Sequence, residues 1–159
     1  MKRSGFTLIE FMVVMGFAAL TASFITATLI RPQTQTDLAG ETDKVIADIR
    51  GQQISAMDGL TSGTSDPVSY GIYFASTGYT LFRGSAYVPG AADNFAVSLP
   101  SSVQFTNITL PSSAIVFTRL TGDVSGYAAG SDSVTLQDTV SNATTTVTIN
   151  RFGAITRTP

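Results

Sequence analysis

The sequence predicts an α+β fold, in which one long amino-terminal α-helix packs on an antiparallel β-sheet domain. Three observations predict it: an apolar run from Phe6 to Ile30, a helical periodicity that continues to Gly59, and a strand-like alternation after Pro67. A chain of 159 residues is about one domain. The expected segments are a leader at 1–5, a hydrophobic transmembrane and assembly half of the helix at 6–30, the second half of the helix at 31–59, and a β-sheet globular domain at 60–159.

The apolar run follows a short basic segment, Met1-Lys2-Arg3-Ser4. Its 25 residues span about 37 Å as a helix, which exceeds the hydrocarbon core of a bilayer at about 30 Å. Two other interpretations compete. An ordinary secretory signal would have a shorter apolar core and a small-residue cleavage site. A plain membrane anchor would leave Gly5 and Glu10 unexplained. The two basic residues favour a cytoplasmic amino terminus.

Glu10 is the only charged residue of the apolar run. A charged side chain at mid-bilayer costs about 2.5–3.5 kcal/mol on insertion scales, so we expect this carboxylate to have a function. The only local partner that the sequence suggests is a new amino terminus, because a cut between Gly5 and Phe6 would place the free amine of Phe6 one helical turn from Glu10. In a bundle of such helices, Glu10 of one chain could pair with the Phe6 amine of its neighbour and set the axial register.

The order Gly5-Phe6-Thr7-Leu8-Ile9-Glu10, behind a basic leader and ahead of an apolar helix, resembles the class III signal of type IV prepilins and type II secretion pseudopilins. The resemblance implies that a prepilin peptidase cuts between Gly5 and Phe6 and that Phe6 is then N-methylated. It implies a single-pass protein of the cytoplasmic (inner) membrane with an exported carboxy-terminal domain, and later a cell-surface or periplasmic filament. The implied partners are the prepilin peptidase, other pilins or pseudopilins in a helical filament, an inner-membrane assembly platform and membrane lipid.

The second half of the helix begins after Arg31-Pro32, where we expect a bend because proline lacks a backbone donor. Thr36 or Asp37 is expected to cap the restart, and Asp58-Gly59 to end the helix. Apolar positions recur at spacings of three, four or seven, and we expect them to pack against the globular domain. These positions are Leu38, Val45, Ile49, Gln53, Ala56 and Leu60, with Ile46 and Met57 beside them.

Eight short segments rich in Thr, Val, Ile and aromatic residues predict β-strands after the loop at 61–67. The first two form a hairpin around Ser76-Thr77-Gly78. The predicted strands are 69–75, 79–83, 95–99, 103–108, 114–118, 133–137, 145–150 and 154–157. The long loops Gly84–Gly90 and Gly122–Ser133 are candidates for contacts with a partner, because binding residues are often on loops.

This β-domain resembles the GspH/FimT type of minor pilins and pseudopilins. The resemblance implies a minor structural subunit of a type IV pilus or type II secretion filament. Members of that family commonly end the terminal hairpin with Gly-Arg, whereas this chain has Gly153-Ala154, which weakens a role in DNA uptake. The segments that carry the resemblance are Tyr70-Gly71-Ile72-Tyr73-Phe74, Gly78-Tyr79-Thr80-Leu81-Phe82, Ile115-Val116-Phe117-Thr118-Arg119-Leu120-Thr121-Gly122, and Val147-Thr148-Ile149-Asn150-Arg151-Phe152-Gly153-Ala154-Ile155.

The composition argues against catalysis. The chain has no histidine and no cysteine, and it contains no phosphate-binding loop or zinc spacing. We therefore expect no enzyme activity, no cofactor and no metal. Asp132 and Asp138 allow two interpretations: a calcium site, or the simpler one of solvated aspartates in turns.

A DNA- or surface-binding module on a pilus is the alternative function. Its candidate DNA contacts are Arg151 and Arg157. Nucleic acid is not expected as a partner, because four arginines balance four aspartates after residue 66 and there is no basic stripe. The simpler interpretation is that both arginines are solvated side chains at the end of the terminal hairpin.

Overall fold

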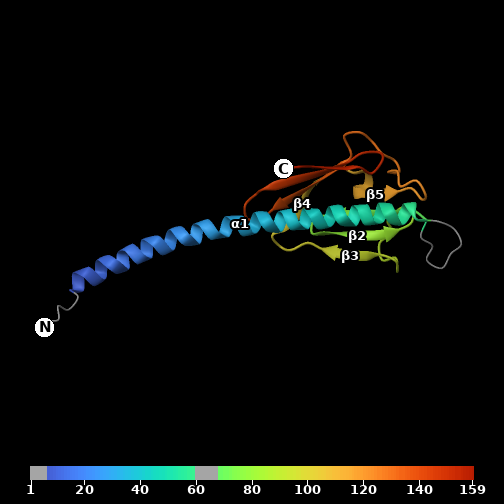
Figure 1. The fold of residues 1–159 in the computed structure, drawn as a ribbon. Helices are drawn as coiled ribbons and strands as arrows, with labels where there is room; N and C mark the ends of the chain where they lie inside the picture. The colour runs from blue at the N-terminus through green and yellow to red at the C-terminus, as the bar shows by residue number, and fades with distance from the viewer. Residues whose placement is uncertain (1–6, 60–67) are drawn as a thin grey trace.

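The computed structural model describes residues 7–59 and 68–159, and the side chains of residues 23–37 lie outside this description. Helix α1 runs from Leu8 to Met57. Figure 1 shows its amino-terminal half extending away from the β-strands and its carboxy-terminal half lying along them. Thr7 caps the start of the helix, and Asp58 caps its end. Gly59 follows at a φ of 60°, so the predicted Asp58-Gly59 stop is confirmed.

Eight strands form two four-stranded antiparallel sheets (Figure 1). The first sheet has the order β3-β2-β1-β5, and the second has the order β4-β6-β7-β8. A short 3-10 helix, η1 (Pro111–Ser113), precedes β5. The strands are β1 (Tyr70–Ala75), β2 (Gly78–Arg83), β3 (Phe95–Ser98), β4 (Val103–Ile108), β5 (Ala114–Phe117), β6 (Ser133–Asp138), β7 (Thr144–Ile149) and β8 (Ile155–Thr158). The predicted strand positions are confirmed to within one residue at each end.

One hydrophobic core joins α1 to both sheets. Val45 and Ile49 of α1 are fully buried in it. Phe74 of β1 meets Phe105 of β4 edge to face, with ring centroids 5.3 Å apart, and this contact links the two sheets. The predicted apolar face of α1 is confirmed at five buried positions: Leu38, Val45, Ile46, Ile49 and Ala56.

Three other members of that predicted face differ. Gln53 is half-buried and donates hydrogen bonds to backbone carbonyls instead of packing in the core. Met57 keeps 49% of its surface exposed. Leu60 lies outside the described residues. The end of α1 therefore contacts the domain through the polar bonds of Gln53 as well as through the buried Ala56.

The predicted fold class, a transmembrane helix packed on an antiparallel sheet, is wrong in two respects. The strands divide into two sheets, because a single eight-stranded sheet would leave one apolar face uncovered by the one helix. Pro100 lies where the chain passes from β3 to β4, and thus from the first sheet to the second.

The second correction concerns the membrane. A helix needs about 20 apolar residues in succession to cross a bilayer. Within the described parts of the chain, no helix is both long and apolar enough to do so. The transmembrane assignment at 6–30 and the single-pass inner-membrane localisation are therefore corrected.

The expected restart of the helix at Thr36 or Asp37 is also wrong, because α1 is assigned as one continuous helix through these positions. The expected bend at Pro32 falls among residues 23–37, whose side chains lie outside the described set.

Candidate functional site

The predicted processing residues Gly5 and Phe6 lie outside the described residues. The description begins at Thr7, directly after the predicted cut. Cleavage and N-methylation at this position therefore remain predictions.

Glu10 is part of a capping box at the start of α1. Its Oε2 accepts a hydrogen bond from the backbone N–H of Thr7 at 3.0 Å and from Thr7 Oγ1 at 2.9 Å. The backbone N–H of Glu10 donates to Thr7 Oγ1 at 3.3 Å. These bonds, with the backbone bond first, lower the pKa of Glu10 from its ordinary value.

Sequence reasoning missed this local partner of Glu10 and considered only the new amino terminus. The signal was present in the sequence, since Thr7-Leu8-Ile9-Glu10 has the Thr-x-x-Glu spacing of a capping box. The intersubunit role of Glu10 remains a prediction, because a capping bond within the chain neither requires it nor forbids it.

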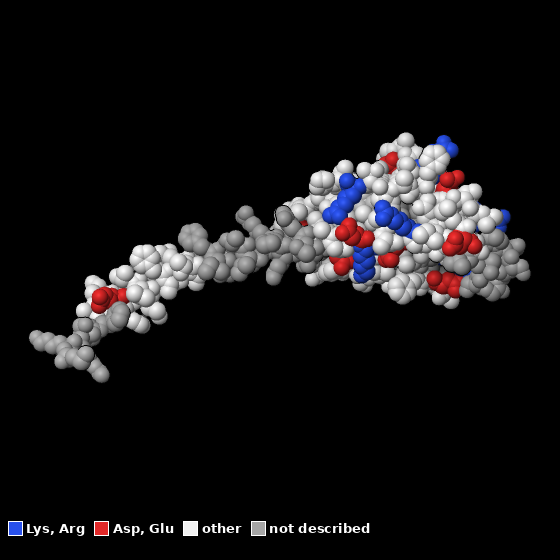
Figure 2. Space-filling model, viewed as in Figure 1, with Lys and Arg blue, Asp and Glu red and all other residues white. Residues whose placement is uncertain are grey.

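An exposed apolar surface surrounds Glu10. In residues 7–22 Glu10 is the only charged residue, and Figure 2 shows this end of the helix as uncharged apart from one acidic group. A helix that is apolar on all sides is normally buried against something. The exposed large side chains, each between 53% and 79% accessible, are Leu8, Ile9, Phe11, Met12, Val13, Val14, Met15, Phe17 and Leu20.

The two arginines predicted as DNA contacts are both engaged within the chain. Arg157 Nη1 lies 2.8 Å from Asp43 Oδ1 of α1. The guanidinium of Arg151 lies 4.7 Å from the centroid of the Phe152 ring. Figure 2 shows basic and acidic groups interspersed over this face of the domain, without a basic stripe. This arrangement offers little for a phosphate backbone.

Asp132 and Asp138 lie at opposite ends of β6, so they cannot share one ion. Asp138 is fully buried, and its Oδ1 accepts bonds from the backbone N–H groups of Val140 and Ser141 and from the Ser141 hydroxyl. The pKa of Asp138 is lowered from its ordinary value, and the hydrogen bond from the Ser141 backbone N–H is the largest cause. Among the described residues, no cluster of acidic side chains could hold a metal ion.

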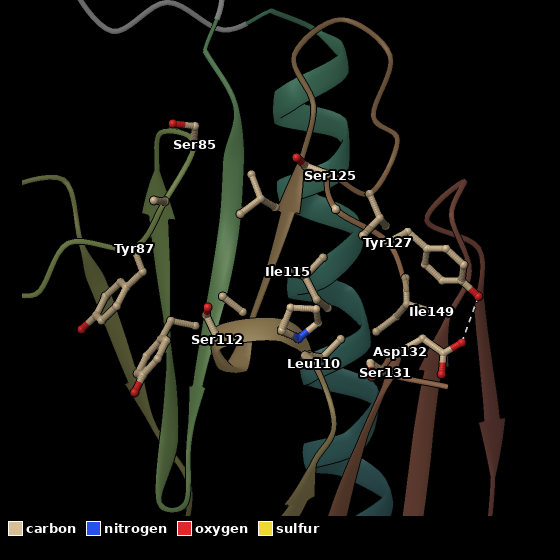
Figure 3. Close-up of a pocket in the computed structure, with 17 residues that line it drawn as sticks. Ser85, Tyr87, Leu110, Ser112, Ile115, Ser125, Tyr127, Ser131, Asp132 and Ile149 are labelled. Carbon is tan, nitrogen blue, oxygen red and sulfur yellow. Dashed lines mark hydrogen bonds between the residues drawn. The ribbon is translucent and has the colours of Figure 1, made fainter. Parts of the chain in front are cut away.

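A cavity of about 350 Å³ lies between the two long loops that the sequence singled out. We call it the inter-loop cavity. Figure 3 shows Tyr127 and Asp132 on one side, Ser85 and Tyr87 on the other, and Ser112 and Ile115 between them. Sequence reasoning marked both loops but did not bring them together. The described residues that line the inter-loop cavity are Tyr73, Ser85, Ala86, Tyr87, Leu110, Pro111, Ser112, Ala114, Ile115, Val116, Val124, Ser125, Gly126, Tyr127, Ser131, Asp132 and Ile149.

Comparison with known proteins identifies no relative: no family model, curated protein or solved structure matches the chain. The pilin, pseudopilin and secretion assignments, which the sequence suggested by resemblance, receive no support from these comparisons.

Proposed function

We propose that the chain is a structural subunit of a helical filament, of the minor pilin or pseudopilin kind found in type IV pili and type II secretion filaments. The observation that carries this proposal is the exposed apolar surface of α1 between Leu8 and Leu20. The proposed role is non-catalytic.

The energetics favour burial of this surface among several neighbouring chains. Fully burying one large apolar side chain stabilises by about 1.5–3 kcal/mol, so nine half-exposed side chains offer on the order of 10 kcal/mol. Association costs about 4–15 kcal/mol in lost freedom. A single partner helix would cover one face only and recover part of this gain, whereas a helical bundle covers every face and recovers all of it, which brings the gain into the range of that cost.

Small residues support the choice of other copies or homologous subunits as the occupants. Gly16, Ala18, Ala19 and Ala22 lie on the same stretch of α1 and allow helices to approach closely. Glu10 is the only charge there and would meet the Phe6 amine of a neighbour. The proposed partners are a prepilin peptidase, other filament subunits and an assembly platform.

Mass spectrometry of the chain from its native host tests the processing step. A mature protein that begins at an N-methylated Phe6 is expected. An intact Met1, or a cut beyond residue 20, would contradict the proposal.

Incorporation into sheared filaments tests the assembly step. Glu10→Ala removes the charge and the capping acceptor, whereas Glu10→Gln removes the charge and keeps an oxygen that can accept from Thr7. If the charge sets the register, both variants are depleted from filaments. Normal incorporation of both would refute the role of Glu10.

A binding module is the second candidate function, and the inter-loop cavity favours it. A DNA-binding form of this candidate is weakened, because Arg157 pairs with Asp43.

A further inference from the structure

We propose that the inter-loop cavity binds a saccharide of one or two pyranose rings. The inference does not depend on filament assembly, because every residue that lines the cavity belongs to the β-domain. It rests on the size of the cavity, its polar groups, its apolar floor and its backbone conformation.

The size and access suit such a ligand. A volume of about 350 Å³ falls within the range of small-molecule sites. Ser85, Ser112 and Ser125 on the rim are exposed, while Ile115 and Ile149 at the floor are buried. A ligand can therefore enter from solvent and reach an apolar base.

The polar groups of the cavity are mostly neutral hydroxyls. Tyr127 donates its hydroxyl proton to Asp132 Oδ2 at 3.0 Å, a bond that helps to raise the pKa of Tyr127. This bond fixes the carboxylate and leaves its second oxygen able to accept from a ligand. The hydroxyl-bearing residues of the lining are Tyr73, Ser85, Tyr87, Ser112, Ser125, Tyr127 and Ser131.

An aromatic pair forms part of the wall. Tyr73 of β1 and Tyr87 of the Gly84–Gly90 loop stack with ring centroids 4.1 Å apart and planes within 5°. Stacking fixes both rings at little further entropic cost. This rigid aromatic pair lies on the opposite face of the first sheet from the core residue Ile115. Its outer side can pack against the C–H face of a pyranose ring, while hydroxyls elsewhere in the lining bind the edge of the ring.

The backbone below the cavity is held in an uncommon conformation. Ser112 and Ser113 both have φ values of 53°, in the left-handed region that non-glycine residues rarely adopt. Strain of this kind concentrates at ligand sites. Of these two serines only Ser112 lines the cavity, and Leu120 and Asn142 also have positive φ values away from it, so strain supports the site only together with its shape.

The charge of the lining favours a neutral polyol over an ionic ligand. Among the described residues of the lining Asp132 alone is charged, and its carboxylate disfavours anions such as phosphate. A cation could pair with it but would leave the neutral hydroxyls without a matched partner. A saccharide uses the carboxylate, the hydroxyls and the apolar floor together.

Titration of the full chain with N-acetylglucosamine, galactose, mannose, maltose and lactose tests this inference. A detergent without a sugar headgroup protects the exposed apolar part of α1 without competing for the site. Because the chain lacks tryptophan, its fluorescence comes from five tyrosines, of which Tyr73, Tyr87 and Tyr127 line the cavity, and saturation-transfer NMR reports on the sugar. Saturable binding of at least one sugar, with a Kd of about 1 mM or tighter, is expected.

Two variants and a matched control localise the binding. Asp132→Asn is expected to weaken it about tenfold, because the acceptor loses its charge and one of its two oxygens becomes a donor. Tyr127→Phe keeps the ring, removes the hydroxyl and is expected to weaken it as well. Asp123→Asn makes the same charge change in the same loop at an exposed position outside the lining, and should leave binding unchanged. Circular dichroism checks that each variant is folded.

Three results would overturn the inference: no saturable binding of any of these sugars, equal binding by the wild type and both cavity variants, or tighter binding of the cation spermidine than of every sugar. Filament incorporation is measured separately, so the failure of either proposal is distinguishable from failure of the other.

Discussion

The side chain of Gln53 links the end of α1 to two loops of the β-domain. Its Nε2 donates to the carbonyl oxygen of Gly122 at 3.0 Å and to that of Phe152 at 2.8 Å. Two separate loops are thereby fixed to the same turn of the helix. Replacing Gln53 by alanine is expected to lower the free energy of unfolding by about 1–3 kcal/mol, because each lost bond contributes about 0.5–1.5 kcal/mol.

We call the two hydrogen bonds of Gln53 to the carbonyl oxygens of Gly122 and Phe152 the Gln53 clamp. Gly153 lies against this clamp and allows a second test of it. Its φ is 77°, and a Cβ built there would lie 2.2 Å from Gln53 Nε2. Gly153→Ala is therefore expected to cost about 1–2 kcal/mol for the left-handed backbone. Displacement of Gln53 adds the loss of its two hydrogen bonds, for a total of about 2–5 kcal/mol.

The double variant separates these two contributions. Once Gln53 is alanine, the added Cβ meets no amide, so Gln53→Ala with Gly153→Ala is expected to be no less stable than Gly153→Ala alone. The coupling free energy is then about 1–3 kcal/mol. Urea unfolding of the full chain, followed by circular dichroism at constant m, measures it.

Gln52→Ala is the matched control. Gln52 is the neighbouring residue in α1, and its buried Oε1 receives no hydrogen bond from the described residues. Its loss is expected to change the stability by less than the loss of Gln53. Additive costs of the Gln53 and Gly153 variants, to within about 0.5 kcal/mol, would refute the clamp.

Three further predictions concern the core, the terminal hairpin and the β6–β7 turn. Ile49→Ala should lower the unfolding free energy by about 2–5 kcal/mol in urea titrations, because it leaves a cavity where α1 packs in the core. Arg157→Ala should cost under about 1 kcal/mol, and less at high salt, because its pair with Asp43 is solvent-exposed. The pKa of Asp138 is lowered from 3.8, so its carboxylate stabilises the fold above that pH and loses this effect as pH falls through the folded pKa. Melting temperatures of Asp138→Asn and the wild type should therefore differ most near neutral pH and converge below pH 3.8.

Local pattern was enough to locate the strands. β4 and β5 were predictable because alternation and β-branched residues are properties of a few consecutive positions. The division into two sheets was not predictable, since it depends on which distant strands pair. Gly71 illustrates the difference: it lies within a predicted strand, but only the fold shows that a Cβ there would lie 2.6 Å from the carbonyl oxygen of Ile115.

The functional residues follow the same division. The carboxylate of Glu10 was found by sequence because its context is local, and its capping partner Thr7 was equally local but overlooked. The pair between Arg157 and Asp43 joins residues 114 positions apart, so no periodicity could reveal it. The inter-loop cavity likewise exists only because the two sheets bring separate loops together.

The geometry of Glu10 bears on the filament role proposed for this residue. The sequence alone suggested only the amine of a new amino terminus as a partner for this carboxylate. In the structure, both bonds from Thr7 end on Oε2, and Oε1 receives no bond from the described residues. A carboxylate can accept through both oxygens. Pairing with a neighbour's amine would therefore add to the capping box instead of replacing it, and the carboxylate would enter a filament already ionised and oriented by its own chain.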